Sequence, residues 1–244
     1  MQRFFGFTKL FHTRKKIKFY SKHFSLLEKP IPTKKKVPQW YKKMQNFPMG
    51  KKESGSVKRC VPFLDALTSG YYIVNNFEVL ITWREPGVLD IRYNQNLEKG
   101  EAYEIDSGIK THLAWQVNDN FYNDNEIKHP LKFDNPWRIE TPKGYSCMFL
   151  NPPNNPSPFR LAEGIVDTDK YKMNINFPFL LKGFEKEVSI PVGLPIVWVV
   201  PFKRESWKME IHNHDLESDD YHTNFFKEFV DNYRNKIWSK KEYD

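Results

Sequence analysis

Short stretches in which apolar and polar residues alternate dominate the chain between about residues 58 and 212. In residues 77–84 every second side chain is large and apolar, which places these side chains on one face of an extended strand. Residues 88–93 alternate again after a Glu-Pro-Gly turn sequence. The two stretches together predict a β-hairpin.

Other short apolar stretches are also bounded by turn residues. They predict strands at residues 17–21, 137–141, 145–150, 165–167, 175–180, 187–190, 196–200 and 207–211. Pro178 lies inside one of them, and we expect it at a sheet edge or a bulge because proline cannot donate to a ladder. The pattern is broken between residues 94 and 130. Without β/α alternation, this spacing indicates a mainly β fold, an antiparallel jelly-roll or cupin-like sandwich.

Helices are expected outside the strands. Pro38 can begin a short helix near residues 39–44, and residues 63–69 predict one or two helical turns that end at Gly70. Apolar residues at helical spacing predict a C-terminal helix from about residue 219 to 238. Its apolar stripe is expected to pack on the β domain, with a partner protein as the alternative.

Charge divides the chain unevenly. Residues 1–52 contain 15 Lys and Arg and one acid, a net charge of +14, whereas residues 53–244 contain 23 Lys and Arg and 29 acids, a net charge of −6. We therefore expect a basic N-terminal arm over 1–56, an antiparallel β domain over 57–214, and an acidic linker with a helix over 215–244. The arm suits a polyanion or a protein partner, although a solvated lysine-rich segment has the same composition.

Basic and aromatic residues stand side by side in this arm, at Lys34, Lys35, Lys36, Trp40 and Tyr41. Lysines attract phosphates and aromatic rings stack on bases, so this combination suits single-stranded nucleic acid or another partner. A solvated arm whose lysine stems cover apolar surface is the alternative.

Jelly-roll oxygenases hold Fe(II) with two His and one carboxylate. His112 and Gln116 are candidates for a degenerate site of this kind, and Asp167 and Asp169 are candidates for its carboxylates or for cation binding. The alternatives are a hydrogen-bonded histidine and an aspartate-rich turn.

Arg204 follows an apolar strand and is a candidate for gripping a ligand carboxylate. The alternative is a structural ion pair with Glu205 or Asp169. His212 and His214 alternate and are weak candidates for a metal pair, as is His112.

Several classes of protein have no signature here. The sequence contains no serine nucleophile elbow, Walker loop or dinucleotide fingerprint. It has no run of 18 apolar residues, so no membrane-spanning helix is predicted. Cys60 and Cys147 each sit in an apolar stretch, which predicts two buried, reduced thiols and leaves a disulfide open.

Several blocks resemble an uncharacterised family found in tailed phages of marine bacteria and in some bacterial genomes. The blocks are residues 60–71, 137–146, 164–169 and 195–204, together with 38–43. The resemblance covers about residues 30–210. It implies the cytoplasm of an infected bacterial cell or a virion as the setting. Because the family has no assigned function, it implies no catalytic residues and no cofactor.

Three functions fit these observations. The first is a jelly-roll module that binds a ligand or a protein. The second is a metal-dependent enzyme resembling Fe(II) oxygenases. The third is a structural component of a virion, with the arm on nucleic acid or on a neighbouring subunit.

Overall fold

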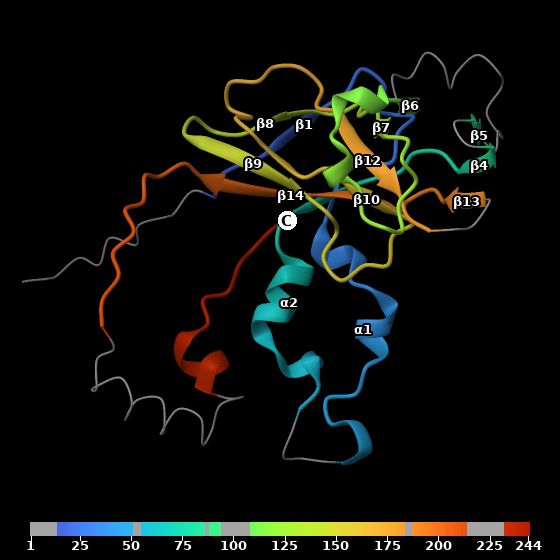
Figure 1. The fold of residues 1–244 in the computed structure, drawn as a ribbon. Coiled ribbons are helices and arrows are strands. Elements are labelled where there is room, and N and C mark those ends of the chain that lie inside the picture. The colour runs from blue at the N-terminus through green and yellow to red at the C-terminus, as the bar shows by residue number, and fades with distance from the viewer. Residues whose placement is uncertain (1–13, 51–54, 86–87, 94–107, 184–186, 214–231) are drawn as a thin grey trace, which may run out of the picture.

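A computed structural model describes residues 14–50, 55–85, 88–93, 108–183, 187–213 and 232–244. Within these ranges the protein is mainly β, with several antiparallel sheets and short helices (Figure 1). In the described part of the chain no sheet closes into a barrel.

The largest sheet has five strands in the order β11-β9-β14-β3-β2. Their bounds are β2 Ile31–Pro32, β3 Tyr71–Val74, β9 Tyr145–Leu150, β11 Gly164–Val166 and β14 Pro195–Lys203. The long strand β14 pairs with β9 on one side and with β3 on the other. Residues from many parts of the chain therefore meet along β14.

Three smaller sheets complete the β structure of the described residues. Their strand orders are β10-β12-β7-β6, β13-β4-β5 and β1-β8. The bounds are β1 Lys18–Tyr20, β4 Val79–Glu85, β5 Val88–Tyr93, β6 Ile109–Thr111, β7 Leu131–Phe133, β8 Arg138–Glu140, β10 Phe159–Leu161, β12 Phe177–Leu181 and β13 Glu187–Ile190.

The core lies where the two larger sheets pack against each other. Phe149 of β9 and Phe177 of β12 place their ring centroids 5.5 Å apart across this junction. Within the four-stranded sheet, the Phe133 and Phe179 rings stack at 4.1 Å, and Phe159 lies 5.3 Å from Phe179. The aromatic residues thus supply much of the core.

Two α-helices, α1 (Gln39–Lys43) and α2 (Val61–Thr68), pack against each other below the sheets in Figure 1. Tyr41 stacks on Phe63 with centroids 5.7 Å apart. Gly70 has a φ of +78°, and a Cβ there would lie 2.5 Å from the Val199 carbonyl oxygen. Glycine is therefore required where the chain turns from α2 into β3. Both predicted helices are confirmed.

The predicted hairpin is confirmed as β4 and β5, although its turn residues 86–87 lie outside the described residues. The strand predicted at 207–211 is wrong, because this segment is extended but pairs with no strand of the described chain. The edge predicted for Pro178 is also wrong, since β12 lies between β10 and β7. Pro178 is tolerated because it lies opposite Ala162, beyond the end of β10. Its carbonyl accepts from Ala162, so its nitrogen faces the same side, where the ladder has already ended and no regular N–H bond is lost.

The C-terminal helix predicted at 219–238 falls mostly outside the described residues. Its described end, Tyr233–Ile237, is a single π-helical turn, and the chain is then extended to Asp244. None of the helices that the structure describes is both long and apolar enough to cross a membrane.

The described part of the basic segment 1–56 is built into the fold. β1 pairs with β8, β2 pairs with β3, and Leu27 is buried in the core. Its lysines therefore decorate the surface of the β domain.

Both cysteines carry free thiols. Cys147 is buried, and burial raises the pKa of its thiol to about 11. Cys60 is exposed, which corrects the expectation that both are buried; it stands just before α2, where the chain runs over the surface.

Candidate functional site

Arg204, directly after β14, is the centre of a polar cluster. Its guanidinium donates to both carboxylate oxygens of Asp169, over 2.9 and 2.6 Å. It also donates to the Ser146 hydroxyl over 2.8 Å and to the Tyr145 carbonyl over 3.0 Å. Asp167 lies 3.2 Å from the guanidinium and accepts a hydrogen bond from Ser146. The fold thus brings three of the predicted residues, Asp167, Asp169 and Arg204, into contact.

This arrangement satisfies Asp169 internally. Its side chain is only 4% exposed, and the Gly144 N–H donates to it over 2.8 Å. The hydrogen bond from Arg204, and then that from Gly144, hold the pKa of the Asp169 carboxyl well below its usual range. The same pairing raises the pKa of Arg204. Because these groups bond each other, the Arg204 cluster is a structural clamp in this conformation, not an open ligand grip.

Asp167 begins a turn and Asp169 lies within it. The N–H groups of Lys170 and Tyr171 both donate to the Asp167 carbonyl. Glu205, the other partner considered for Arg204, forms an ion pair with Lys203 instead.

Acid is expected to weaken this clamp. Because the folded-state pKa of Asp169 is depressed, its contribution to stability is fully present above the unfolded pKa of about 4 and is lost as the pH falls below that value. Thermal unfolding of the wild type and of Asp169→Asn, measured from about pH 6 down to about pH 3, should show the stability gap between them narrowing as the pH falls. A stability gap that does not change with pH would contradict the stabilising role of the ionised Asp169 carboxyl.

His112 and Gln116 lie beside the four-stranded sheet, whereas the aspartates follow β11 of the five-stranded sheet. His112 follows β6 at the edge of the four-stranded sheet, and its ring bonds the Gln116 side chain. The structure does not bring this pair to the Arg204 cluster. His212 is exposed, 3.6 Å from Glu210, and His214 lies outside the described residues. In the described ranges, no three His, Cys, Asp or Glu side chains gather as a metal site would require.

The two aromatic residues of the predicted nucleic-acid site, Trp40 and Tyr41, pack against other residues of the protein. Tyr41 is 4% exposed, and its hydroxyl donates to the Lys58 carbonyl. Trp40 is 38% exposed and donates to the Asn154 carbonyl, while its ring contacts Phe63. Lys34, Lys35 and Lys36 are exposed on a 3-10 turn, and Lys34 pairs with Asp244 over 2.6 Å.

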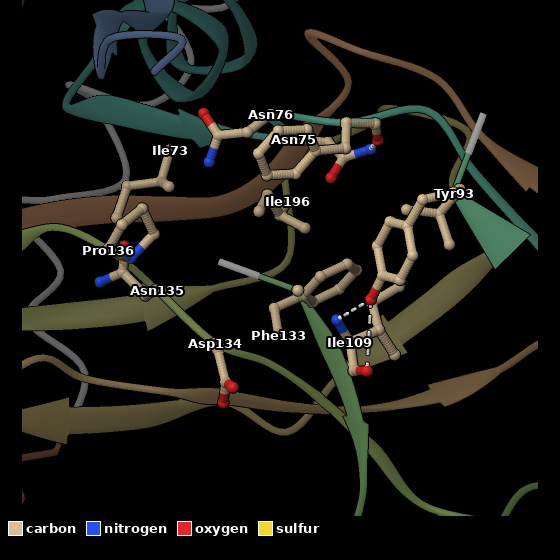
Figure 2. A pocket seen from close by; sticks show the side chains of 13 residues that line it. Ile73, Asn75, Asn76, Tyr93, Ile109, Phe133, Asp134, Asn135, Pro136 and Ile196 are labelled. Carbon is tan, nitrogen blue, oxygen red and sulfur yellow. Dashed lines mark hydrogen bonds between the residues drawn. The ribbon is translucent and has the colours of Figure 1, made fainter. Parts of the chain in front are cut away.

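An internal cavity lies between β3, β5, β6 and β7 (Figure 2). Its volume is about 10 Å³, room for about one water molecule. Two buried amides beside it already bond the backbone: Asn75 donates to the Ile190 carbonyl and Asn135 to the Trp137 carbonyl. Tyr93 bonds the main chain of Ile109, as the dashed lines in Figure 2 mark. This cavity is therefore part of the core and not a ligand site.

A much larger hollow, here called the basic groove, opens between the two ends of the described chain. Its volume is about 780 Å³. One wall is the segment entering β1, the other is the C-terminal segment, which ends beside β14 in Figure 1. The lining residues are Arg14, Lys15, Lys16, Ile17, Lys18, Tyr71, Thr141, Pro142, Tyr145, Pro201, Lys240, Lys241, Glu242, Tyr243 and Asp244.

The lining of the basic groove is positive, with six Lys or Arg and two acids, although Lys18 and Lys241 also pair with acids outside the lining, Glu140 and Asp65. Both acids, Glu242 and Asp244, contact the guanidinium of Arg14. Three tyrosines supply aromatic surface. Tyr71 packs edge-on against Tyr243 with centroids 5.8 Å apart, and burial, followed by the nearby Tyr243 and Asp244, raises the pKa of Tyr71.

Cationic surface continues past β1. A second hollow, of about 620 Å³, is lined by the residues that follow Lys18 and by Lys22, Arg138 and Lys172. Cationic side chains therefore lie on both sides of β1, although Lys18, Arg138 and Lys172 also pair with Glu140 of β8. This distribution suits an extended ligand better than a compact one.

Sequence reasoning identified one part of this site. The charge count had marked the segment containing Arg14–Lys18, but no pattern pointed to Tyr71, Tyr145 or the C-terminal residues. Their meeting depends on β3, β9 and β14 lying side by side, and on a C-terminal segment that returns across more than two hundred residues to Arg14.

No protein-family model matches this sequence, and no curated protein shows a significant match to it.

Proposed function

We propose that this chain is a non-enzymatic binding module whose ligand is an extended polyanion, single-stranded nucleic acid in particular, held in the basic groove. The observation that carries the proposal is the gathering of six cationic side chains and three tyrosines around one open groove. The proposal keeps the polyanion that the basic segment suggested, and it moves the aromatic contacts from Trp40 and Tyr41 to Tyr71, Tyr145 and Tyr243.

The chemistry of the groove matches that of a single strand. Phosphates repeat along the strand and are attracted by Lys and Arg, with release of bound counterions. Bases present flat faces that stack on aromatic rings without regard to sequence. Tyr71, Tyr145 and Tyr243 are all half-buried, so each is held in place while part of its side chain stays accessible.

The contacts of the C-terminal carboxylates support the proposal that the basic groove binds anionic groups. Arg14 meets Glu242 and Asp244, and Lys34 meets Asp244. These carboxylates stand where phosphate oxygens of a bound strand would approach the same cations. The groove in this conformation is thus partly filled by an anionic segment of its own chain.

Fluorescence anisotropy with a labelled oligothymidylate of about 12 nucleotides tests the proposal. Binding is expected at low salt and should weaken by orders of magnitude between about 50 and about 200 mM NaCl, because several phosphate contacts are lost together. An oligonucleotide that stays unbound at low salt would overturn the proposal.

Neutralising the C-terminal acids should tighten this binding. In the double variant Glu242→Gln, Asp244→Asn, Arg14 and Lys34 lose their internal partners and the groove gains two units of positive charge. We expect the oligonucleotide to bind about threefold to tenfold more tightly at low salt. The exposed pair Glu205→Gln, Asp124→Asn, which lies outside the groove lining, changes the net charge equally and serves as the control. Equal gains in both variants would show a general charge effect and no competition in the groove.

We further propose that the two larger sheets form a jelly-roll or cupin-like sandwich and that the chain belongs to the phage-type family it resembles, acting in an infected bacterial cell or in a virion. The contact of Phe149 with Phe177 supports a sandwich. Residues 137–146, 164–169 and 195–204, which carry much of the resemblance, meet at the Arg204 cluster. The Fe(II) enzyme gains no such support, because its candidate ligands lie beside different sheets.

A further inference from the structure

Three large apolar side chains stand almost fully exposed in the segment after β14, here called the exposed strip (residues 205–213). Trp207, Met209 and Ile211 are 87%, 82% and 86% exposed. They alternate in sequence, so in an extended segment they share one side. Figure 1 shows this segment, in orange, running away from the sheets.

The opposite side of the exposed strip carries charge. The Lys208 ammonium lies 3.1 Å from the Glu210 carboxylate, and His212 lies 3.6 Å from the same carboxylate. Contacts between residues two apart confirm that these side chains lie on one face of an extended backbone. The strip is therefore an extended segment with an apolar side and a charged side, and no strand within the described ranges pairs with it.

We propose that the exposed strip is a dimer interface, in which two copies of this chain pair as antiparallel strands about a two-fold axis through Met209. Pairing would supply the backbone hydrogen bonds that an isolated strand lacks, and it would remove Trp207, Met209 and Ile211 of both copies from water.

Charge selects the second copy as the occupant and fixes the register. With Met209 opposite Met209, Lys208 of each copy faces Glu210 of the other, and Trp207 faces Ile211. Moving the centre of pairing to Lys208 or to Glu210 places like charges opposite each other, which is unfavourable. The strip is thus self-complementary in the register centred on Met209.

Charge reversal tests this pairing in the full chain without nucleic acid, so the result is independent of the groove. Sedimentation velocity of the wild type should show a concentration-dependent dimer. Lys208→Glu alone or Glu210→Lys alone should weaken the dimer at least about tenfold, because each creates two like-charge pairs. The double variant Lys208→Glu, Glu210→Lys restores opposite charges and should restore the dimer. A wild type that stays monomeric at high concentration, or a dimer that the single reversals leave intact, would overturn the proposal.

A cross-link tests the register itself. In a Cys60→Ser background, Met209→Cys should form an intermolecular disulfide under mild oxidation, since residue 209 lies on the axis. Val192→Cys, at a position 50% exposed outside the strip, is the control for random collision. Equal yields in both variants, or a monomer whose Trp207 is shielded from acrylamide by its own chain, would contradict the interface.

Discussion

Phe179→Ala is expected to lower the free energy of unfolding by about 3–5 kcal/mol. Phe179 is 1% exposed in the four-stranded sheet, stacked on Phe133 and packed against Phe159. Truncation removes the transfer free energy of the ring and leaves a cavity beside the Phe133 and Phe159 rings, whose centroids lie 5.1 Å apart and which strand pairing keeps from collapsing fully into the space.

Urea denaturation followed by circular dichroism measures this loss. Phe24→Ala is the matched control, because Phe24 is 54% exposed and should cost about 1 kcal/mol or less. Similar losses at the two positions would mean that the aromatic cluster of β7, β10 and β12 does not form the core.

The triple variant Lys15→Gln, Lys16→Gln, Lys18→Gln is expected to show the largest loss of oligonucleotide binding. All three lysines line the basic groove. Removing three phosphate contacts should weaken binding about tenfold to a hundredfold at low salt. It should also make the negative slope of log K against log salt less steep by about two.

The control removes three lysines elsewhere. Lys35, Lys42 and Lys43 are exposed on the 3-10 turn and on α1, away from the groove lining. Their replacement by Gln changes the net charge by the same amount. If this control variant loses as much affinity as the groove variant, binding is a diffuse effect of net charge, and the groove is not the site.

The elements that the sequence predicted well are those whose pattern is local. β4 and β5 alternate on both sides of a turn sequence, so the hairpin follows from adjacent residues. β7 and β10 also alternate, as Leu-Lys-Phe and Phe-Arg-Leu, but three residues are too few to separate a strand from a loop. These strands exist because they pair with β12, which contacts between distant residues decide.

The exposed strip has a clear local pattern for a strand but forms no strand pairing in the described chain. Its alternation is as regular as that of β4, and it predicts a strand. Alternation reports that one side of a segment is apolar, however, and not which strand will pair with it. Trp207, Met209 and Ile211 stay exposed because no strand of the described chain lies beside them.

The two candidate sites also depend on contacts between distant residues, which the sequence pattern does not specify. The ion pair of Arg204 with Asp169 was one of two alternatives, and only the neighbouring positions of β9, β11 and β14 decide between them. The basic groove required residues near both chain ends to meet over Tyr71, which no spacing in the sequence encodes.

Photo-cross-linking with a 4-thiothymidine oligonucleotide, followed by mass spectrometry of the peptides, tests the central claim most directly. A strand bound in the basic groove should cross-link to peptides that contain Tyr71, Tyr145 or Tyr243. Cross-links confined to Trp40 and its neighbours, or scattered over surface lysines with none at these tyrosines, would contradict it.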